Sequence, residues 1–376
     1  MKLNNNQQAF FSLIKSGLWE QDAQLSQFDE IDYSEVMKLA EEQSVVGLVV
    51  AGLEHVIDVQ VPKEDVLHFV GRTLQLEQRN IAMNAYVATL IDNLRSNGIN
   101  AAVLVKGQGV AQCFERPLWR ASGDVDLLLD TDNYERAKQL LLPLAEDVED
   151  EFKSFKHIGM TMPGGFVVEL HGTSHSRLSN RVDKVIDNVQ KDVFFGGSVR
   201  AWQDGDSLVL LPAPDNDIFF VFTHILHHFF LEGVGLRQIC DWCRLLWTFR
   251  KEIHVNQVEQ WLREADLMNE WMSFAAMVVE YLGMPEDAMP FYDPQYRDKG
   301  EKILEFVLET GNFGHNRRIV SSGSLVGDKA YSLWCKVKDF AHHAKVFPIN
   351  SIRFFPHFAM NGLKEATSKI LCGTHT

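Results

Sequence analysis

A pair of aspartates at the start of an apolar run is the feature that most constrains this chain. Val125 to Leu129 is a continuous apolar segment, typical of a strand that is buried on both faces. Because side chains alternate along a strand, Asp124 and Asp126 lie on the same face at its start. Two carboxylates held side by side repel each other unless a cation lies between them. Carboxylate oxygens favour Mg²⁺ or Mn²⁺ over zinc, so the pair predicts a divalent-cation site.

Two further apolar segments support this interpretation. Ala102 to Val105 predicts a buried strand that stops at Lys106-Gly107, and Phe166 to Leu170 predicts another that carries Glu169. An isolated Asp-x-Asp is common in turns and surface strands, where it binds no metal. Its setting here, between a Lys-Gly strand end and a later acidic strand, favours a metal site. The predicted catalytic and metal-binding set is Asp124, Asp126 and Glu169.

The order of these motifs resembles the nucleotidyltransferase superfamily, which includes DNA polymerase β and kanamycin nucleotidyltransferase. A bacterial group of uncharacterised nucleotidyltransferases is more similar still, with Leu-Lys-Gly, an arginine, Asp-(Ile/Val)-Asp-Leu-Leu and Glu-Leu-His in that order. The resemblance covers roughly residues 75 to 250. The residues that carry it are Lys106-Gly107, Arg120, Asp124 to Leu128 and Glu169-Leu170-His171, with Leu211-Pro212, His224, His228, Leu236-Arg237 and Asp241 downstream.

This resemblance implies attack by an acceptor hydroxyl on the α-phosphate of a nucleoside triphosphate, which transfers a nucleoside monophosphate and releases pyrophosphate. It also implies two Mg²⁺ (or Mn²⁺) ions on the carboxylates, with Glu169 on the acceptor side as ligand and proton acceptor. The superfamily places Gly-Ser or Gly-Gly in the first turn, whereas this chain has Gly107-Gln108-Gly109. Its glycines still permit a close backbone approach to a phosphate. The implied nucleotide-binding residues are Lys106, Gly107, Gly109, Arg120 and Gly123.

Three of the site residues have a structural alternative. Lys106 either contacts the triphosphate, which we favour, or forms an ion pair with a carboxylate. Arg120 fits a phosphate clamp and an orienting partner of the aspartates equally well. His171 faces the same side as Glu169, either as a partner of the metal ligands or as an ordinary hydrogen-bonded histidine.

The function also has alternatives. The acceptor is a small molecule, a sugar or a protein hydroxyl, and the residues do not choose among them. One competing class is a catalytically silent relative that binds a nucleotide or a partner protein. The other is an antitoxin-like protein that modifies a partner polypeptide. Retention of all three carboxylates weighs against the silent relative.

Charge and cysteine content narrow the range of partners. A formal net charge of −15 argues against extended nucleic-acid binding, which needs clustered lysine and arginine. The five cysteines are an odd number and the N-terminal residues MKLNNNQQAF lack an apolar leader, so we expect a cytoplasmic protein. No segment approaches the roughly 20 apolar residues of a membrane span.

The overall pattern predicts an α+β fold. A small mixed β-sheet core (98–212) lies between an N-terminal helical region (1–97) and a C-terminal helical domain (213–376). In the N-terminal region we expect helices over Phe10 to Leu18, over Tyr33 to Val56 with a cap at Asp32, and from Pro62 through Leu94.

Within the core, turn residues and helical spacing predict the remaining elements. These are a short helix over Val110 to Phe114, a helix over Asn133 to Leu142 capped by Thr131 or Asp132, a hairpin that turns at Pro163-Gly164-Gly165, and strands on both sides of Asp204-Gly205-Asp206.

Histidines and cysteines that follow the core raise the question of zinc. His224, His227 and His228 share a face of one predicted helix, and Cys240-x-x-Cys243 comes after it. The spacing fits no zinc finger, and the resemblance already accounts for the histidines, so we expect no zinc here. The role of the three histidines stays open.

Overall fold

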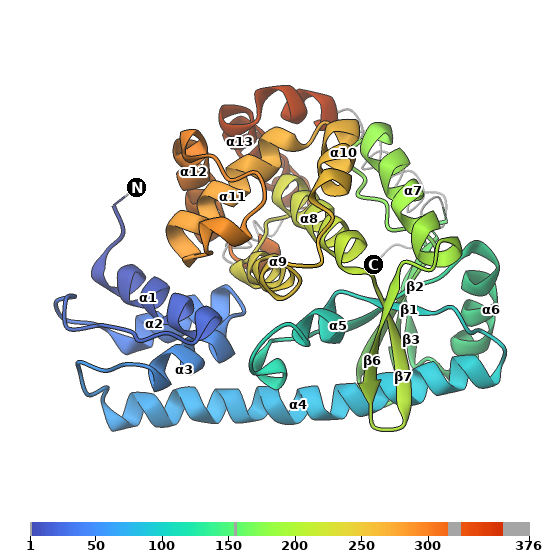
Figure 1. The fold of residues 1–376 in the computed structure, drawn as a ribbon, viewed down its shortest axis with the longest axis horizontal. Coiled ribbons are helices and arrows are strands. Elements are labelled where there is room, and N and C mark those ends of the chain that lie inside the picture. The colour runs from blue at the N-terminus through green and yellow to red at the C-terminus, as the bar shows by residue number, and fades with distance from the viewer. Residues whose placement is uncertain (1, 154–155, 315–324, 356–376) are drawn as a thin grey trace.

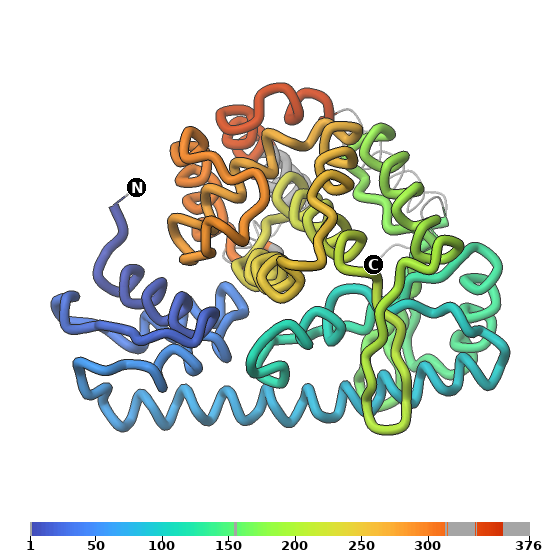
Figure 2. The backbone as a smooth tube through the Cα atoms, viewed as in Figure 1, coloured from blue at the N-terminus to red at the C-terminus, as the bar shows by residue number. Residues whose placement is uncertain are grey.

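The computed structural model describes residues 2–153, 156–314 and 325–355, and it places helices around one mixed sheet. Figure 1 shows the long helix α4 (Lys63–Ser96) along one edge of the molecule, with α1 to α3 over its first half and the sheet over its second half. The C-terminal helices lie above both, and the tube in Figure 2 follows the same path. The predicted α+β class is confirmed. Within the described ranges, no helix combines the length and apolarity that a membrane crossing requires.

The sheet has seven strands in the order β3-β4-β5-β2-β1-β7-β6. Strand β2 is antiparallel to β1 and parallel to β5, and β1 is parallel to β7. The strands predicted at the two core segments, in the hairpin and around Asp204-Gly205-Asp206 are all present. They are β1 (Val103–Val105), β2 (Asp124–Leu128), β4 (His157–Met162), β5 (Phe166–His171), β6 (Val199–Asp204) and β7 (Ser207–Pro212). The short edge strand β3 (Asp147–Val148) was not predicted.

Alternation along the central strands gives the sheet two different faces. Val125 and Leu127 point to a core that α4 and α6 (Thr131–Leu141) close from one side. Leu128 points to the opposite face and joins the larger core built with the C-terminal helices. Asp124 and Asp126 share the face of Leu128, so they are directed toward those helices.

The single helix predicted from Tyr33 to Val56 is wrong, because the chain forms two helices there. These are α2 (Tyr33–Glu42) and α3 (Val46–Glu54), and they follow α1 (Asn5–Trp19). Ser44, at φ 56°, turns the chain between them. The buried Gln43 fixes the break, because its amide donates to Val307 O at 3.2 Å and accepts from Leu236 N at 3.0 Å. Long-range contacts therefore override the helical periodicity.

Two predicted helix starts in the core also need correction. Helix α6 begins at Thr131 because Asp130, not Thr131 or Asp132, is its cap; the Asp130 carboxylate accepts from two backbone N–H groups at 3.0 Å. The short helix after β1 spans Gly107–Ala111 and not Val110 to Phe114, since the carbonyl of Lys106 already accepts the first helical bonds. The predicted cap at Asp32 is confirmed.

From Pro214 the chain is helical through most of its described length, with breaks at the glycines and prolines that predict them. Residues 356–376 lie outside the described residues. The boundaries proposed at 97/98 and 212/213 stay a prediction. The helices are α7 (Asn180–Phe195), α8 (Pro214–Leu231), α9 (Leu236–Thr248), α10 (Val255–Ala265), α11 (Met268–Leu282), α12 (Arg297–Thr310) and α13 (Leu325–Val346).

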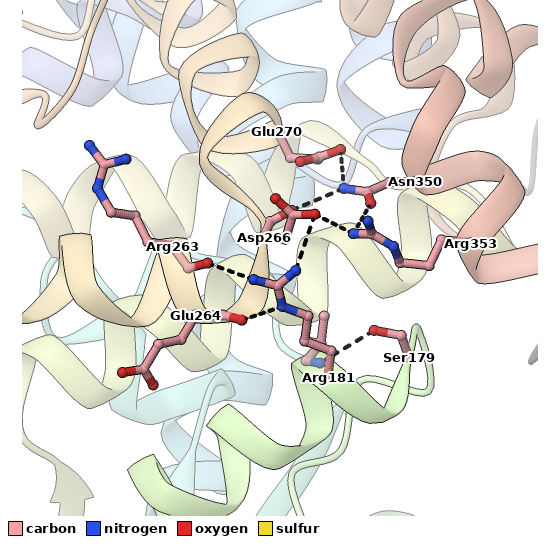
Figure 3. Close-up of polar contacts among 9 residues, drawn as sticks. Ser179, Arg181, Arg263, Glu264, Asp266, Glu270, Asn350 and Arg353 are labelled. Atoms are coloured by element: carbon pink, nitrogen blue, oxygen red, sulfur yellow. Dashed lines mark hydrogen bonds and ion pairs between the residues drawn. The ribbon is translucent and has the colours of Figure 1, made fainter.

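A polar cluster fastens the C-terminal helices to α7. Figure 3 shows the carboxylate of Asp266 between Arg181, at 3.4 Å, and Arg353. Asn350 donates to the backbone carbonyl of Asp266 at 3.1 Å and to the carboxylate of Glu270 at 2.7 Å. The cluster joins segments that are far apart in the sequence.

Helices α1 and α3 approach each other closely at glycines, which generates a stability prediction. A Cβ on Gly52 would lie 2.0 Å from the backbone carbonyl oxygen of Leu13, so Gly52→Ala must push the helices apart. We expect a loss of roughly 1–3 kcal/mol in the free energy of unfolding. The matched control is Gly71→Ala on the exposed face of α4, where a Cβ meets nothing within 4 Å. It should gain about 0.5–1 kcal/mol, because alanine favours a helix. Denaturant unfolding measures both changes. An equal change in the free energy of unfolding for Gly52→Ala and Gly71→Ala would contradict the close packing of α1 and α3.

Glu270 generates a prediction about pH. Burial raises its pKa to about 7, although the hydrogen bond from Asn350 opposes the shift. A carboxyl whose pKa is higher in the folded state than in the unfolded state stabilises the fold fully only below the unfolded value, near 4.5. That contribution is lost as the pH rises through about 7, and the loss is roughly 3 kcal/mol.

Glu270→Gln should therefore flatten the fall in stability between about pH 5 and pH 8 and leave the variant more stable than the wild type at the higher pH. Unfolding in denaturant at both pH values measures this. The exposed Glu286→Gln, which removes one negative charge at the surface, is the control. An unchanged pH slope in Glu270→Gln would contradict the burial effect.

Candidate active site

A cavity of about 540 Å³ lies between the polar face of the sheet and the helices α8 and α9. The loop after β5, from Thr173 to Arg177, forms part of its wall, together with residues of α8 and α9. The acidic residues of β2 and β5 line it, and so does Lys106. The sheet therefore presents its charged side chains to a cavity large enough for a small ligand.

The structure brings Asp124, Asp126 and Glu169 together in this cavity. Asp126 is the direct cross-strand neighbour of Glu169 in the parallel pairing of β2 with β5. One carboxylate oxygen from each of the three residues lies within 4.8 Å of the others. Three carboxylates in such a group form a donor set of hard oxygen atoms, which fits Mg²⁺ or Mn²⁺.

Lys106 follows β1 in a backbone conformation that is rare for a residue with a side chain, at φ 59° and ψ −149°. Such strain costs about 1–3 kcal/mol and is common at functional sites. In this backbone conformation, Lys106 Nζ forms an ion pair of 2.8 Å with Asp126 Oδ1. The carboxylate contact that was the alternative for Lys106 is thus present, and its contact with a triphosphate stays a prediction.

Two histidines also contact the carboxylates. His171 Nε2 lies 2.8 Å from Asp126 Oδ1 and 3.4 Å from Glu169 Oε2. His157 Nε2 lies 3.1 Å from Glu169 Oε2. His171 was among the predicted residues, whereas His157 was missed. The predicted hairpin contained the signal, because a turn at Pro163-Gly164-Gly165 sets a register that pairs His157 with His171.

The three carboxyl groups have different pKa values. The charge of Asp126 and burial raise the pKa of Asp124. Burial opposes ionisation of Asp126, but Lys106 and the hydrogen bond with His171 outweigh it and lower its pKa. Burial is likewise outweighed at Glu169, where the two histidines lower the pKa far below its usual range. Asp126 and Glu169 are therefore ionised at neutral pH.

Arg120 is engaged on the wall of the cavity. Its guanidinium forms two bonds with Asp241 on α9, Nε to Oδ1 at 3.0 Å and Nη2 to Oδ2 at 2.5 Å, and a third with Ser122 at 3.0 Å. Arginine and aspartate are both buried. The guanidinium fork is therefore paired with Asp241 of α9, and both predicted roles of Arg120, as a phosphate clamp and as an orienting partner of Asp124 and Asp126, stay predictions. Arg237, which also lines the cavity, keeps a pKa of about 10 after burial lowers it, so it is a cation at neutral pH.

The three predicted glycines lie in different places. Gly107 lines the cavity at φ 44°, as a close backbone approach requires. Gly109 is buried in α5 (Gly107–Ala111), where a Cβ would lie 2.6 Å from a methyl carbon of Leu211, so it serves packing. Gly123 is not among the residues that line the cavity, and a Cβ there would meet nothing within 4 Å.

The α8 histidines line the cavity opposite the sheet. His224 Nε2 faces His228 Nε2 at 3.0 Å, and His227 Nδ1 donates to the carbonyl of Ser176 at 2.7 Å. Cys240 and Cys243 lie apart from them in the apolar core, where burial raises the pKa of both thiols. Among the described residues, no group of potential metal ligands joins these cysteines to the histidines.

The buried pair of Arg120 and Asp241 generates a prediction. Arg120→Met leaves a buried aspartate without its partner and should destabilise the fold by about 3–5 kcal/mol. Adding Asp241→Leu should restore most of that loss, since both charges are then gone. Denaturant unfolding of the two single variants and the double variant completes the cycle. A fully stable Arg120→Met with weakened nucleotide binding would instead show that Arg120 is a phosphate clamp.

Comparison with known proteins agrees with this geometry. A family model described as "Uncharacterised nucleotidyltransferase" matches residues 29–283, well over half of the chain, and this span holds every residue of the cavity named above. Searches of the curated proteins and of the solved structures found no match. From the extent of the family match, the chain belongs to the family of uncharacterised nucleotidyltransferases.

Proposed function

We propose that the protein transfers a nucleoside monophosphate from a nucleoside triphosphate to a hydroxyl acceptor. The acceptor oxygen forms a bond to the α-phosphorus, and the bond from that phosphorus to the bridging oxygen breaks. Pyrophosphate leaves with the electron pair of the broken bond. The observation that carries this proposal is the group of three carboxylates, within 4.8 Å of one another, that lines a cavity in a nucleotidyltransferase family member.

The donor set fits two Mg²⁺ or Mn²⁺ ions, which would be held by Asp124, Asp126 and Glu169. When bound, such ions polarise the phosphate oxygens and neutralise the charge that develops on them. Asp126 and Glu169 are ionised before any ion arrives, so they bind cations without losing a proton. In this assignment Glu169 serves the acceptor side and receives the hydroxyl proton.

The chain's own cations and histidines complete the site. Lys106, paired with Asp126 at 2.8 Å, places a positive charge beside the position of the phosphates. Gly107 lets the backbone approach them closely. His157 and His171 both contact Oε2 of Glu169 and restrict the orientation of its carboxylate before the reaction.

The cavity favours a compact acceptor. A volume of about 540 Å³ falls in the usual range of small-molecule sites, roughly 300–1,000 Å³. A net charge of −15 disfavours a long anionic polymer. A small molecule, a sugar or one protein hydroxyl that reaches the cavity mouth therefore fits better than the end of a nucleic acid.

The reaction is tested with four nucleoside triphosphates labelled at the α-phosphate, incubated with Mg²⁺ or Mn²⁺ and cell extract. We expect label in one acceptor and release of unlabelled pyrophosphate. Label in a single polypeptide would identify the partner-modifying class. A metal-dependent nucleotide thermal shift with no pyrophosphate release would identify a silent relative and contradict the proposal.

Glu169→Gln distinguishes a catalytic role from a structural one. If Glu169 serves the acceptor side, the variant should bind the triphosphate nearly as well as the wild type but transfer the nucleoside monophosphate at least about 10²-fold more slowly. A transfer rate near that of the wild type would exclude the catalytic role of Glu169.

Asp124→Asn and Asp126→Asn should each abolish divalent-cation binding at the aspartate site while the fold stays intact, as Mn²⁺ calorimetry and melting curves will show. Asp147→Asn, on the exposed edge strand β3, is the matched control.

A further inference from the structure

Glu169 belongs to two groups of potential metal ligands, and only one of them is made of oxygen atoms alone. The first is the carboxylate group with Asp124 and Asp126. The second joins Glu169 to His157 and His171, with one donor atom of each residue again within 4.8 Å of the others. The second group arises because β4 pairs with β5 and places the two histidines opposite each other.

We propose that His157, Glu169 and His171 form a separate metal site of two imidazole nitrogens and one carboxylate oxygen. This donor set selects a transition-metal ion such as Mn²⁺, Co²⁺ or Zn²⁺ over Mg²⁺. Its meaning for catalysis rests on the proposed function: the acceptor-side ion would be of this kind, and Glu169 would connect it to the ion on the aspartates. The existence of the site does not depend on that function.

The distances from the Glu169 carboxylate to the two histidines match those between ligand atoms around one metal ion. Metal–nitrogen and metal–oxygen distances of about 2.0–2.2 Å separate neighbouring ligand atoms by roughly 2.8–3.6 Å in octahedral or tetrahedral geometry. Glu169 Oε2 lies 3.1 Å from His157 Nε2 and 3.4 Å from His171 Nε2. Both imidazoles thus present the same ring nitrogen to one carboxylate oxygen.

The surroundings of the histidines are compatible with metal binding. His157 Nδ1 is buried and has no partner among the described protein atoms, so no contact at that atom requires His157 to donate from Nε2. His171 Nε2 also lies 2.8 Å from Asp126 Oδ1, which places a fourth donor beside the set. The two side chains are each 16% exposed on the cavity, so an ion has access to them.

The competing interpretation is a hydrogen-bonded network in which both histidines orient Glu169 through their protons. The two interpretations differ in what Mn²⁺ contacts. A bound Mn²⁺ with imidazole ligands shows nitrogen hyperfine coupling in pulsed electron paramagnetic resonance, whereas a Mn²⁺ with oxygen ligands alone does not. This measurement needs no nucleotide and no acceptor.

The experiment titrates the full chain with Mn²⁺ at about pH 8, where free imidazole is neutral. We expect nitrogen coupling in the wild type that persists in excess Mg²⁺ and disappears when Zn²⁺ is added. His157→Gln and His171→Gln should each weaken Mn²⁺ binding at this site by at least about tenfold, and the double variant should lose the coupling. His175→Gln, which removes a cavity imidazole bound to Asp187 at 2.7 Å, is the matched control and should retain it.

Absence of nitrogen coupling in the Mn²⁺-loaded wild type overturns the proposal, and so does unchanged coupling in the folded double variant. If the double variant fails to fold, as a melting curve would show, the folded single variants decide, because His227 and His228 form a further candidate group with Glu232 and could also give nitrogen coupling. The result is separate from the proposed function. Label transfer without nitrogen coupling removes only this site, and nitrogen coupling without label transfer removes only the reaction.

Discussion

Mutual repulsion among three carboxylates on two neighbouring strands is the constraint that the rest of the site depends on. Asp124, Asp126 and Glu169 are directed into one cavity by strand alternation and by the register of β2 with β5. Without compensation, burial would protonate them. Lys106 supplies one positive charge at the price of a strained backbone. The paired histidines supply hydrogen bonds that hold Glu169 ionised.

A second buried charge pair connects this strand pair to the helical side of the cavity. Arg120, which precedes β2, holds Asp241 of α9 through two hydrogen bonds. Because an unpaired buried charge is costly, the pair fixes α9 relative to the strand that carries the aspartates. The position of the cavity wall is thereby linked to the position of the carboxylates. The two parallel hydrogen bonds between the guanidinium and the carboxylate fix the relative orientation of the two elements more strictly than apolar packing does.

The sequence was most informative where one local pattern determines the structure. The apolar runs and their alternation predicted the central strands and the shared face of Asp124 and Asp126, because a strand's period needs no tertiary information. The break at Ser44 was missed because distant partners of Gln43 determine it. The Asp241 partner of Arg120 lies on another element 121 residues away, so spacing in the sequence does not reveal it. His157 was missed although the hairpin register implied it.

Helix α4 affects how a substrate reaches the carboxylates. Its 34 residues extend for about 50 Å as one unbroken rod, with α2 and α3 against its first half and β7 against its second. Helices of the N-terminal and C-terminal regions also share one apolar core. A movement that separates the N-terminal helices from the sheet and the C-terminal helices would require helix α4 to bend and the shared apolar core to open. Under the proposed function, an acceptor would therefore enter the cavity without such a separation, so the width of the existing opening would limit which acceptors reach the carboxylates.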